Sequence, residues 1–494
     1  MGKTEKQGSR MRLLTGWAEV DLTPAQPVIL SGQFHARLSE GVADPIQATV
    51  WALESGREQA VFVGCDLFCI SDELSEAVVA RLDVRYAETG LDPRNVMLHA
   101  THTHTAPEIQ PHSGNSAHAP GGDSELKLDA LAVEAYVSWT AERLAQAIVS
   151  AWLSRAPGGI AYGIGHAVVG HNRRWVNDAG RAAMYALLPE VNDTFRHIEG
   201  FEEHSVHVAS VYDSAGTLTG VVVNVPCPSQ ASEADFVISA DYWHEARQEL
   251  RRRLGEHLFI LPQCSAAGEQ TPTLLFGKQP YERMLRLKGR TARDEIAHRL
   301  ASAVEEVVAV IGGTIDYAPC LRHSVETVEL PLNELDEADA SEAAREAELW
   351  RAIYEQERSK LERSPELCES PRWYVDATHA YFRNRWNGAV VRRHERQRAG
   401  LAETITVHVV RLGDVVFSTN PYELYVDYGI QLQVRSPALQ TFIVQLAGPG
   451  TYVPSPRSTA GGGYGSVPAS NPVGPEGGQQ LVDTTVRLIR ALWV

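Results

Sequence analysis

Short apolar runs alternate with helical patterns along most of the chain. Apolar runs occupy residues 48–55, 60–68 and 95–104, and a helical stretch lies at 72–89 between the second and the third. Strands that alternate with helices in this way are typical of α/β proteins. We therefore expect an α/β fold with mixed β-sheets flanked by helices.

Three further segments have patterns that predict elements. Residues 128–153 carry apolar side chains at helical spacing, which predicts a long covering helix. Residues 205–213 and 218–226 are apolar runs on either side of a DSAGT turn, which predicts a hairpin. A further helix is expected after Asp241, whose side chain can cap it.

Two segments are ambiguous on composition. Residues 326–363 include a highly charged stretch that is rich in good helix formers, so an exposed helix is favoured over a disordered linker. Residues 448–475 are rich in Gly, Pro and Ser, although they include Tyr452 and Tyr464. Composition alone predicts a flexible linker there.

Charge and length narrow the class of protein. The chain has 494 residues, 44% of them hydrophobic, and a formal net charge of −17. Such a charge repels nucleic-acid phosphates, so we expect no nucleic-acid partner. A polar start and the lack of a long apolar run predict a cytoplasmic protein with no integral membrane segment. The six scattered cysteines fit reduced thiols.

The sharpest local feature is the run of alternating Thr and His at 101–105, directly after an apolar strand. Residues two apart in an extended segment point to the same side, so His102 and His104 can converge. Such a pair suits a metal ligand beside a group that polarises the substrate. Two structural histidines at the end of a strand are the alternative. No phosphate-binding glycine loop, Cys-x-x-Cys pair or His-Glu-x-x-His helix is present.

This run resembles the Thr-His-Thr-His signature of neutral, non-lysosomal ceramidases. Further segments match that family in order, and they span residues 16–464, nearly the whole chain. The resemblance implies one large catalytic domain at 16–494 after a polar tail at 1–15. The matching segments are 64–67, 95–107, 171–174, 224–228, 239–242, 263–272 and 421–423, with Tyr452 and Tyr464.

The resemblance also implies a set of site residues. The family's zinc ligands fall on His102, Cys227, Glu423 and Tyr452, and its groups around the scissile carbonyl fall on His104, Arg173 and Tyr464. Thr271 stands where the family has a hydroxyl residue near the substrate.

Three of these assignments have structural alternatives. Cys227 departs from the family, which has histidine there, so it is either a thiolate ligand or a buried thiol. Glu423 could instead be a charge at a helix N-terminus. Arg173 could instead belong to a structural ion pair.

The implied activity is hydrolysis of an amide or ester carbonyl by water bound to Zn²⁺. The chain ends shortly after Tyr464, which leaves no room for the immunoglobulin-like domain of secreted ceramidases. We therefore expect a soluble small-molecule substrate and little activity on membrane ceramide. The alternatives are a hydrolase or lyase for a carbohydrate derivative, and a binding protein that has lost its metal. The sequence leaves the oligomeric state open.

Overall fold

The computed structural model describes residues 11–110, 126, 128–185 and 193–494. Its largest element is an eight-stranded mixed sheet with the order β12-β11-β10-β5-β1-β2-β3-β4. The predicted hairpin is confirmed as the antiparallel pair β10 and β11. The strands of this sheet are β1 (Leu14–Asp21), β2 (Gln47–Ser55), β3 (Glu58–Cys65), β4 (Val96–Ala100), β5 (Ala156–His166), β10 (Ser205–Asp213), β11 (Leu218–Val225) and β12 (Phe259–Cys264).

A four-stranded sheet with the order β14-β15-β16-β18 packs face to face on the large sheet. Its strands are β14 (Leu321–Leu330), β15 (Glu403–Leu412), β16 (Val415–Thr419) and β18 (Gln440–Val444). Aromatic side chains fill the space between the sheets. Trp51 and Phe62 of the large sheet contact Phe417 of the small one, at ring-centroid distances of 6.0 and 5.0 Å. The interior is therefore a two-sheet sandwich.

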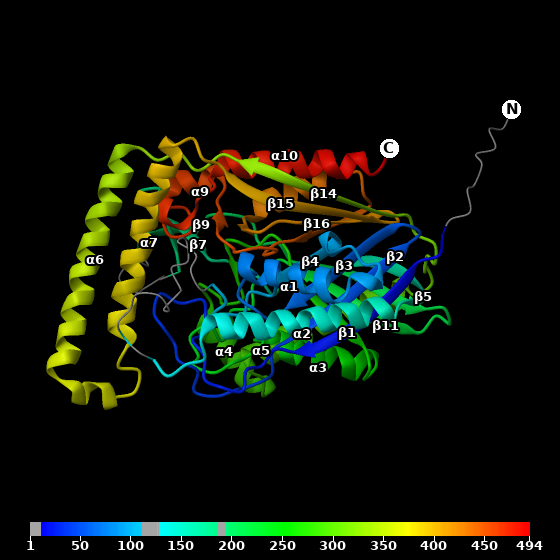
Figure 1. Cartoon of the computed structure of the whole chain (residues 1–494), viewed down its shortest axis with the longest axis horizontal. Helices are drawn as coiled ribbons and strands as arrows, with labels where there is room; N and C mark the ends of the chain where they lie inside the picture. Colours follow the sequence, from blue (N-terminus) through cyan, green and yellow to red (C-terminus); the bar gives the residue numbers. More distant parts are fainter. Residues whose placement is uncertain (1–10, 111–125, 127, 186–192) are drawn as a thin grey trace.

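Helices cover both outer faces of the sandwich, which makes four layers (Figure 1). The large sheet is covered by α1 (Asp72–Arg85), α2 (Val133–Leu153), α3 (Tyr242–Leu254) and α5 (Ala292–Ile311), and the small sheet by α8 (Val426–Arg435) and α10 (Pro475–Ala491). The predicted covering helix is α2, and Asp241 caps α3 as expected. This architecture confirms the α/β fold class. None of the helices formed by the described residues is long and apolar enough to cross a membrane.

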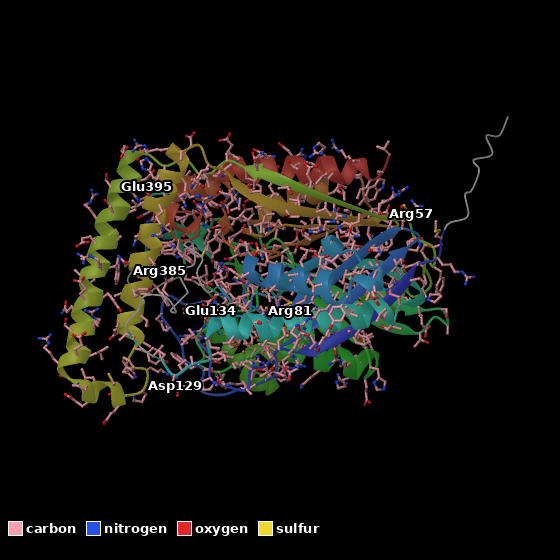
Figure 2. The ribbon with its side chains drawn as sticks, in the orientation of Figure 1. Arg57, Arg81, Asp129, Glu134, Arg385 and Glu395 are labelled. Atoms are coloured by element: carbon pink, nitrogen blue, oxygen red, sulfur yellow. The ribbon has the colours of Figure 1, made fainter. Side chains whose placement is uncertain are left out.

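Two long helices, α6 (Glu337–Arg363) and α7 (Val375–Arg398), form an antiparallel pair at one end of the molecule (Figure 1). The expectation of an exposed helix in this charged stretch is confirmed by α6, although the first residues of the stretch belong to β14. Figure 2 shows Arg385 and Glu395 along α7, at the opposite end of the molecule from Arg57.

The segment at 448–475 is not a flexible linker, so the expectation from composition is wrong there. Its Tyr452 is buried and pairs in parallel with Glu423. Tertiary pairing thus orders a segment that composition alone describes as loose. The remaining β-strands and α-helices of the described residues are β6 (His171–Asn172), β7 (Arg174–Asn177), β8 (Ala182–Met184), β9 (Phe195–Ile198), β13 (Gln270–Thr271), β17 (Glu423–Leu424), β19 (Tyr452–Val453), α4 (Lys278–Lys288) and α9 (Pro456–Gly461).

Candidate active site

The candidate site lies where parallel strand pairs end. β3 runs parallel to β4, β11 to β12, and β16 to β18. The carboxyl ends of such strands, with the loops that follow them, are the usual ligand site in open α/β sheets. The segments after these strands contain Phe68, His102, Cys227, Gly268, Glu423 and Tyr452.

The histidine pair follows β4, which ends at Ala100. Its backbone is not extended, because His102 adopts a left-handed conformation with φ of 65°. The expected extended geometry is therefore wrong, yet the rings of His102 and His104 still meet, with centroids 4.9 Å apart. The amide of His102 donates to the Leu67 carbonyl over 3.0 Å, and its Nδ1 lies 2.8 Å from the Phe68 carbonyl oxygen. These two contacts hold the turn.

His102, Glu423 and Tyr452 come together although they are far apart in sequence. Nε2 of His102 lies 3.4 Å from the carboxylate of Glu423. The short strands β17 and β19 place Glu423 beside Tyr452 as a parallel pair. All three side chains are buried. Three of the four residues that the resemblance implies as metal ligands thus form one group.

Arg173 connects this group to the surrounding loops. Its Nη2 donates to the Tyr452 hydroxyl over 3.1 Å and lies 3.7 Å from the Glu423 carboxylate. The same nitrogen donates to the Gly268 carbonyl over 2.7 Å, and Nη1 donates to the Tyr185 hydroxyl. The guanidinium therefore has a fixed orientation at the site.

The neighbouring Arg174 has a structural role instead. Its Nε lies 2.5 Å from the Glu199 carboxylate, and both side chains are buried. It also donates to the backbone carbonyls of Tyr464 and Gly462, over 2.8 and 2.6 Å. Arg174 thus forms a structural ion pair, and it holds the loop that carries Tyr464.

His104 belongs to a second polar group. Nε2 of His104 lies 2.9 Å from the amide nitrogen of Gln230, and Nδ1 lies 3.5 Å from the Glu233 carboxylate. The Gln230 oxygen accepts from Arg173 over 3.4 Å, so its NH₂ group faces His104. His104 Nε2 is therefore the acceptor, and Nδ1 carries the proton toward Glu233.

Two buried residues hold the loop that carries Gln230 and Glu233. Arg37 donates to the backbone carbonyls of Glu233 and His104, which joins the loops on both sides. Asp241 accepts from the backbone amides of Ala231 and Ser232, over 3.1 and 2.7 Å. The position of the loop is thus set by contacts at its backbone.

The charges of the site follow from these contacts. Burial opposes ionisation of Glu423, but His102 and Arg173 outweigh it and hold the pKa of this carboxyl below its usual range. Burial raises the pKa of Glu233. Burial also raises the pKa of the Tyr452 hydroxyl well above its usual value. At neutral pH, Glu423 is therefore an anion and Tyr452 is a neutral hydroxyl.

Aromatic side chains form one wall of the site. The ring of Tyr464 lies edge to face with that of Tyr452 at 5.5 Å, and their hydroxyls are hydrogen-bonded. Phe34 and Trp386 stand 5.7 and 6.2 Å from the Tyr464 ring. Because Trp386 comes from α7, the helical pair at the end of the molecule reaches the site.

Thr271 lies in β13 and is fully buried. Its side chain forms a hydrogen bond with Tyr185, and its hydroxyl accepts from the Thr273 amide over 3.3 Å. The structure thus places Thr271 behind Tyr185, the partner of Arg173. A contact between Thr271 and substrate stays a prediction.

Cys227 follows the end of β11 and is buried. Its Sγ lies 3.5 Å from the Pro228 carbonyl oxygen. Burial, and then the neighbouring thiol of Cys264, raise the pKa of Cys227 well above its usual value. A neutral thiol is therefore the stable form of this side chain, and its role as a metal ligand stays a prediction.

A cavity of about 860 Å³ opens beside the polar groups. Its walls include His102, His104, Glu423, Tyr452 and Tyr464. This volume is in the range of cavities that take small molecules. Buried polar groups that converge on such a cavity are typical of an active site.

Comparison with solved structures shows which known proteins share this fold. A structure described as ceramidase complexed with C2 has a TM-score of 0.67 and 17% sequence identity over 98% of this chain and 75% of that chain. The neutral ceramidase from Pseudomonas aeruginosa has a TM-score of 0.65 and 18% identity over 97% of this chain and 75% of that chain. The chain has the neutral ceramidase fold. No protein-family model and no curated protein sequence matches it.

Sequence reasoning missed three residues that face the site within this ceramidase fold. Tyr185 holds Arg173, and Gln230 and Glu233 contact His104. Gln230 and Glu233 stand in a polar loop between two segments that resemble the family. Their place in the sequence between these segments was the only indication of a role at the site. Tyr185 has φ of 62°, a conformation that no sequence pattern indicated.

The ceramidase fold raises the question whether these residues fit a metal ion. His102 directs Nδ1 to a carbonyl oxygen, so this nitrogen carries a proton, and Nε2, which is an acceptor when the ring is neutral, faces the Glu423 carboxylate. Two acceptors that face each other are favourable only with a cation or a proton between them. Within the described part of the chain, no three His, Cys, Asp or Glu side chains form a group that could hold a metal ion. The fit therefore rests on His102, Glu423 and the Tyr452 hydroxyl.

Proposed function

We propose that the protein is a hydrolase that cleaves an amide or ester of a small molecule, and that His102, Glu423 and Tyr452 hold a zinc ion. The convergence of these three residues with Arg173 beside one cavity carries the proposal. Two solved structures that share the fold are described as a ceramidase and a neutral ceramidase, which supports hydrolysis as the reaction class. Bound zinc would supply an activated water and polarise the scissile carbonyl.

Arg173 provides positive charge for the oxygen that becomes negative during the reaction. Its contacts with Gly268 and Tyr185 hold the guanidinium in place before substrate enters. The hydroxyl of Tyr464, next to Tyr452, is a second donor at the same wall. Fixed donors of this kind stabilise developing charge because they need no reorganisation.

His104 and Glu233 are the groups that handle protons in this proposal. The Gln230 amide keeps the His104 proton on Nδ1, which faces the Glu233 carboxylate. Because burial raises the pKa of Glu233, this carboxyl accepts a proton more readily than an exposed one. The pair can therefore pass a proton between His104 and the leaving group.

The test combines metal analysis with a substrate panel. Soluble acyl amides, acyl esters, glycosides and lactones are assayed with protein whose zinc content is measured by mass spectrometry. We expect zinc near one per chain and hydrolysis of an amide or ester. Cleavage of glycosides alone would support the carbohydrate alternative. Lack of zinc together with lack of turnover would support a binding protein.

Two variants separate the roles of the site residues. Glu423→Gln is expected to lower zinc content and turnover together. Arg173→Met is expected to lower kcat by about 10² to 10³ and to leave zinc in place, as loss of an oxyanion donor does. Arg345→Met, on the exposed face of α6, removes the same charge as a control. Unchanged kcat in Arg173→Met would contradict its role.

Cys227 is proposed as a fourth zinc ligand on the strength of the sequence resemblance. Metal binding would have to deprotonate this buried thiol, which zinc does at thiolate sites. Cys227→Ser is then expected to lower zinc content and activity together. Equal zinc in the wild type and in the Ser variant would leave a site of three residues, without Cys227.

A further inference from the structure

The cavity beside the site has a second, acidic part of its wall. Besides the buried site residues, it is lined by Asp72 and Glu73 in the first turn of α1 and by Glu403 at the start of β15. Asp72 is exposed, and Glu73 and Glu403 are half-buried. This part of the cavity is therefore open to solvent, whereas the site residues lie in its interior.

This acidic part of the wall has more carboxylate groups than nearby cationic groups. Arg94 also lines the cavity, but it is paired with Asp92 at 2.7 Å. The only ion pair recorded for Glu403 within the described residues is with Arg396, at 3.6 Å. Burial raises the pKa of Glu403, Arg396 and Arg393 oppose this shift, and the charge of Asp72 adds to it. The wall therefore has an excess of negative charge that a bound cation would relieve.

Tyr422 adds an independent sign of a missing ligand. Its side chain is 4% exposed and lines the same cavity. Its hydroxyl has no hydrogen-bond partner among the residues that the structure describes. A buried polar group without a partner costs about 1–3 kcal/mol, so a ligand that bonds to it is favoured. A phenolic hydroxyl oxygen has lone pairs that can accept a hydrogen bond from an ammonium group.

We infer that Asp72, Glu403 and Tyr422 bind an ammonium group at the outer part of the cavity, so the substrate is an N-acyl derivative of an amine that carries a second, cationic amine. The identity of the cleaved bond rests on the function proposed above. An ammonium group has three donors for these oxygens. An organic cation fits better than a bare metal ion, because the described His, Cys, Asp and Glu residues offer no metal-binding group of three.

The experiment uses two series of probes that differ only in charge. Monoacetylated linear diamines with three to six methylenes are compared with N-alkylacetamides in which a methyl group replaces the ammonium. We expect KM to be at least tenfold lower for the best ammonium probe than for its neutral partner. Glu403→Gln, Asp72→Asn and Tyr422→Phe should each reduce this ratio. Equal KM for both series at every length would overturn the inference.

A matched control excludes an effect of net charge alone. Glu306→Gln removes one carboxylate from the exposed face of α5 and should leave the ratio unchanged. If Glu306→Gln reduced the ratio of the two KM values as much as Glu403→Gln does, a local subsite would be contradicted. Thermal melting checks that each variant is folded. If Glu403→Gln does not fold, Asp72→Asn provides the test instead.

Calorimetric titration with 1,6-diaminohexane separates this inference from the proposed function. Binding that Glu403→Gln and Asp72→Asn weaken, without hydrolysis of any probe, would support the subsite and contradict the hydrolase. Hydrolysis of both series with equal KM, without diamine binding, would support the hydrolase and overturn the subsite.

Discussion

Arg247 of α3 and Asp66, which follows β3, form a fully buried ion pair with two hydrogen bonds of 2.7 and 2.9 Å. Asp66 also accepts from the Thr101 hydroxyl over 3.4 Å, one residue before His102. The pair therefore joins a covering helix to the ends of β3 and β4, and the histidine pair follows the second of these strands.

Loss of Arg247 is expected to destabilise the fold strongly. Arg247→Met leaves the carboxylate of Asp66 buried without its partner, which costs about 3–5 kcal/mol. Arg252→Met breaks an exposed pair with Glu249 in the same helix and should cost less than about 1 kcal/mol. Urea unfolding of both variants measures the difference. Equal losses would show that the buried pair contributes no more than the exposed one.

Gly32 is expected to be required for the position of His104. A Cβ at Gly32 would lie 2.5 Å from the His104 ring, and its φ of 95° already favours glycine. Gly32→Ala should therefore displace His104 and lower turnover at least tenfold.

Gly90→Ala is the matched control for this prediction. Gly90 has φ of 74°, but a Cβ there would meet no atom within 4 Å. Both variants suffer backbone strain, and only Gly32→Ala adds the clash. Turnover that falls equally in the two variants, at equal melting temperature, would contradict a specific role of Gly32.

Acid is expected to destabilise the protein through its buried histidines. Burial lowers the pKa of His99 to about 3, and neither ring nitrogen has a partner among the described residues. The unfolded chain therefore binds more protons below pH 6.5, its usual pKa. The stability that neutral His99 contributes is complete above pH 6.5 and is lost as the pH falls from 6.5 toward 3.

His99→Phe should remove this sensitivity. Between pH 7 and pH 5 the variant is expected to lose about 2 kcal/mol less unfolding free energy than the wild type. Exposed His257 provides the control, since His257→Phe should follow the wild type. Denaturant unfolding at the two pH values measures both. Parallel losses in the wild type and His99→Phe would contradict the prediction.

Local pattern was enough for several elements and for part of the site. The hairpin of β10 and β11, the helix α2 and the cap at Asp241 follow from alternation, helical spacing and a side chain that bonds a free amide. These features depend on neighbouring residues, so they can be predicted without the fold. The ordered resemblance added the ceramidase fold, because the matching segments are too short to interpret one at a time.

Tertiary structure alone decided which distant groups meet. Glu423 and Tyr452 become neighbours because β17 pairs with β19. Composition alone had predicted a flexible linker for the segment at 448–475, which contains Tyr452. Arg173 rather than Arg174 faces the site because Glu199 takes the second guanidinium.

The sequence by itself determined the α/β class, the main helices and the histidine pair at the end of β4, because periodicity and short-range bonds are local properties. Only the fold determined the left-handed turn at His102, the contact of Gln230 and Glu233 with His104, and the cavity shared with Glu403. These depend on loops from separate strands that pack together, and the free energy of such contacts exists only once the sheets have formed.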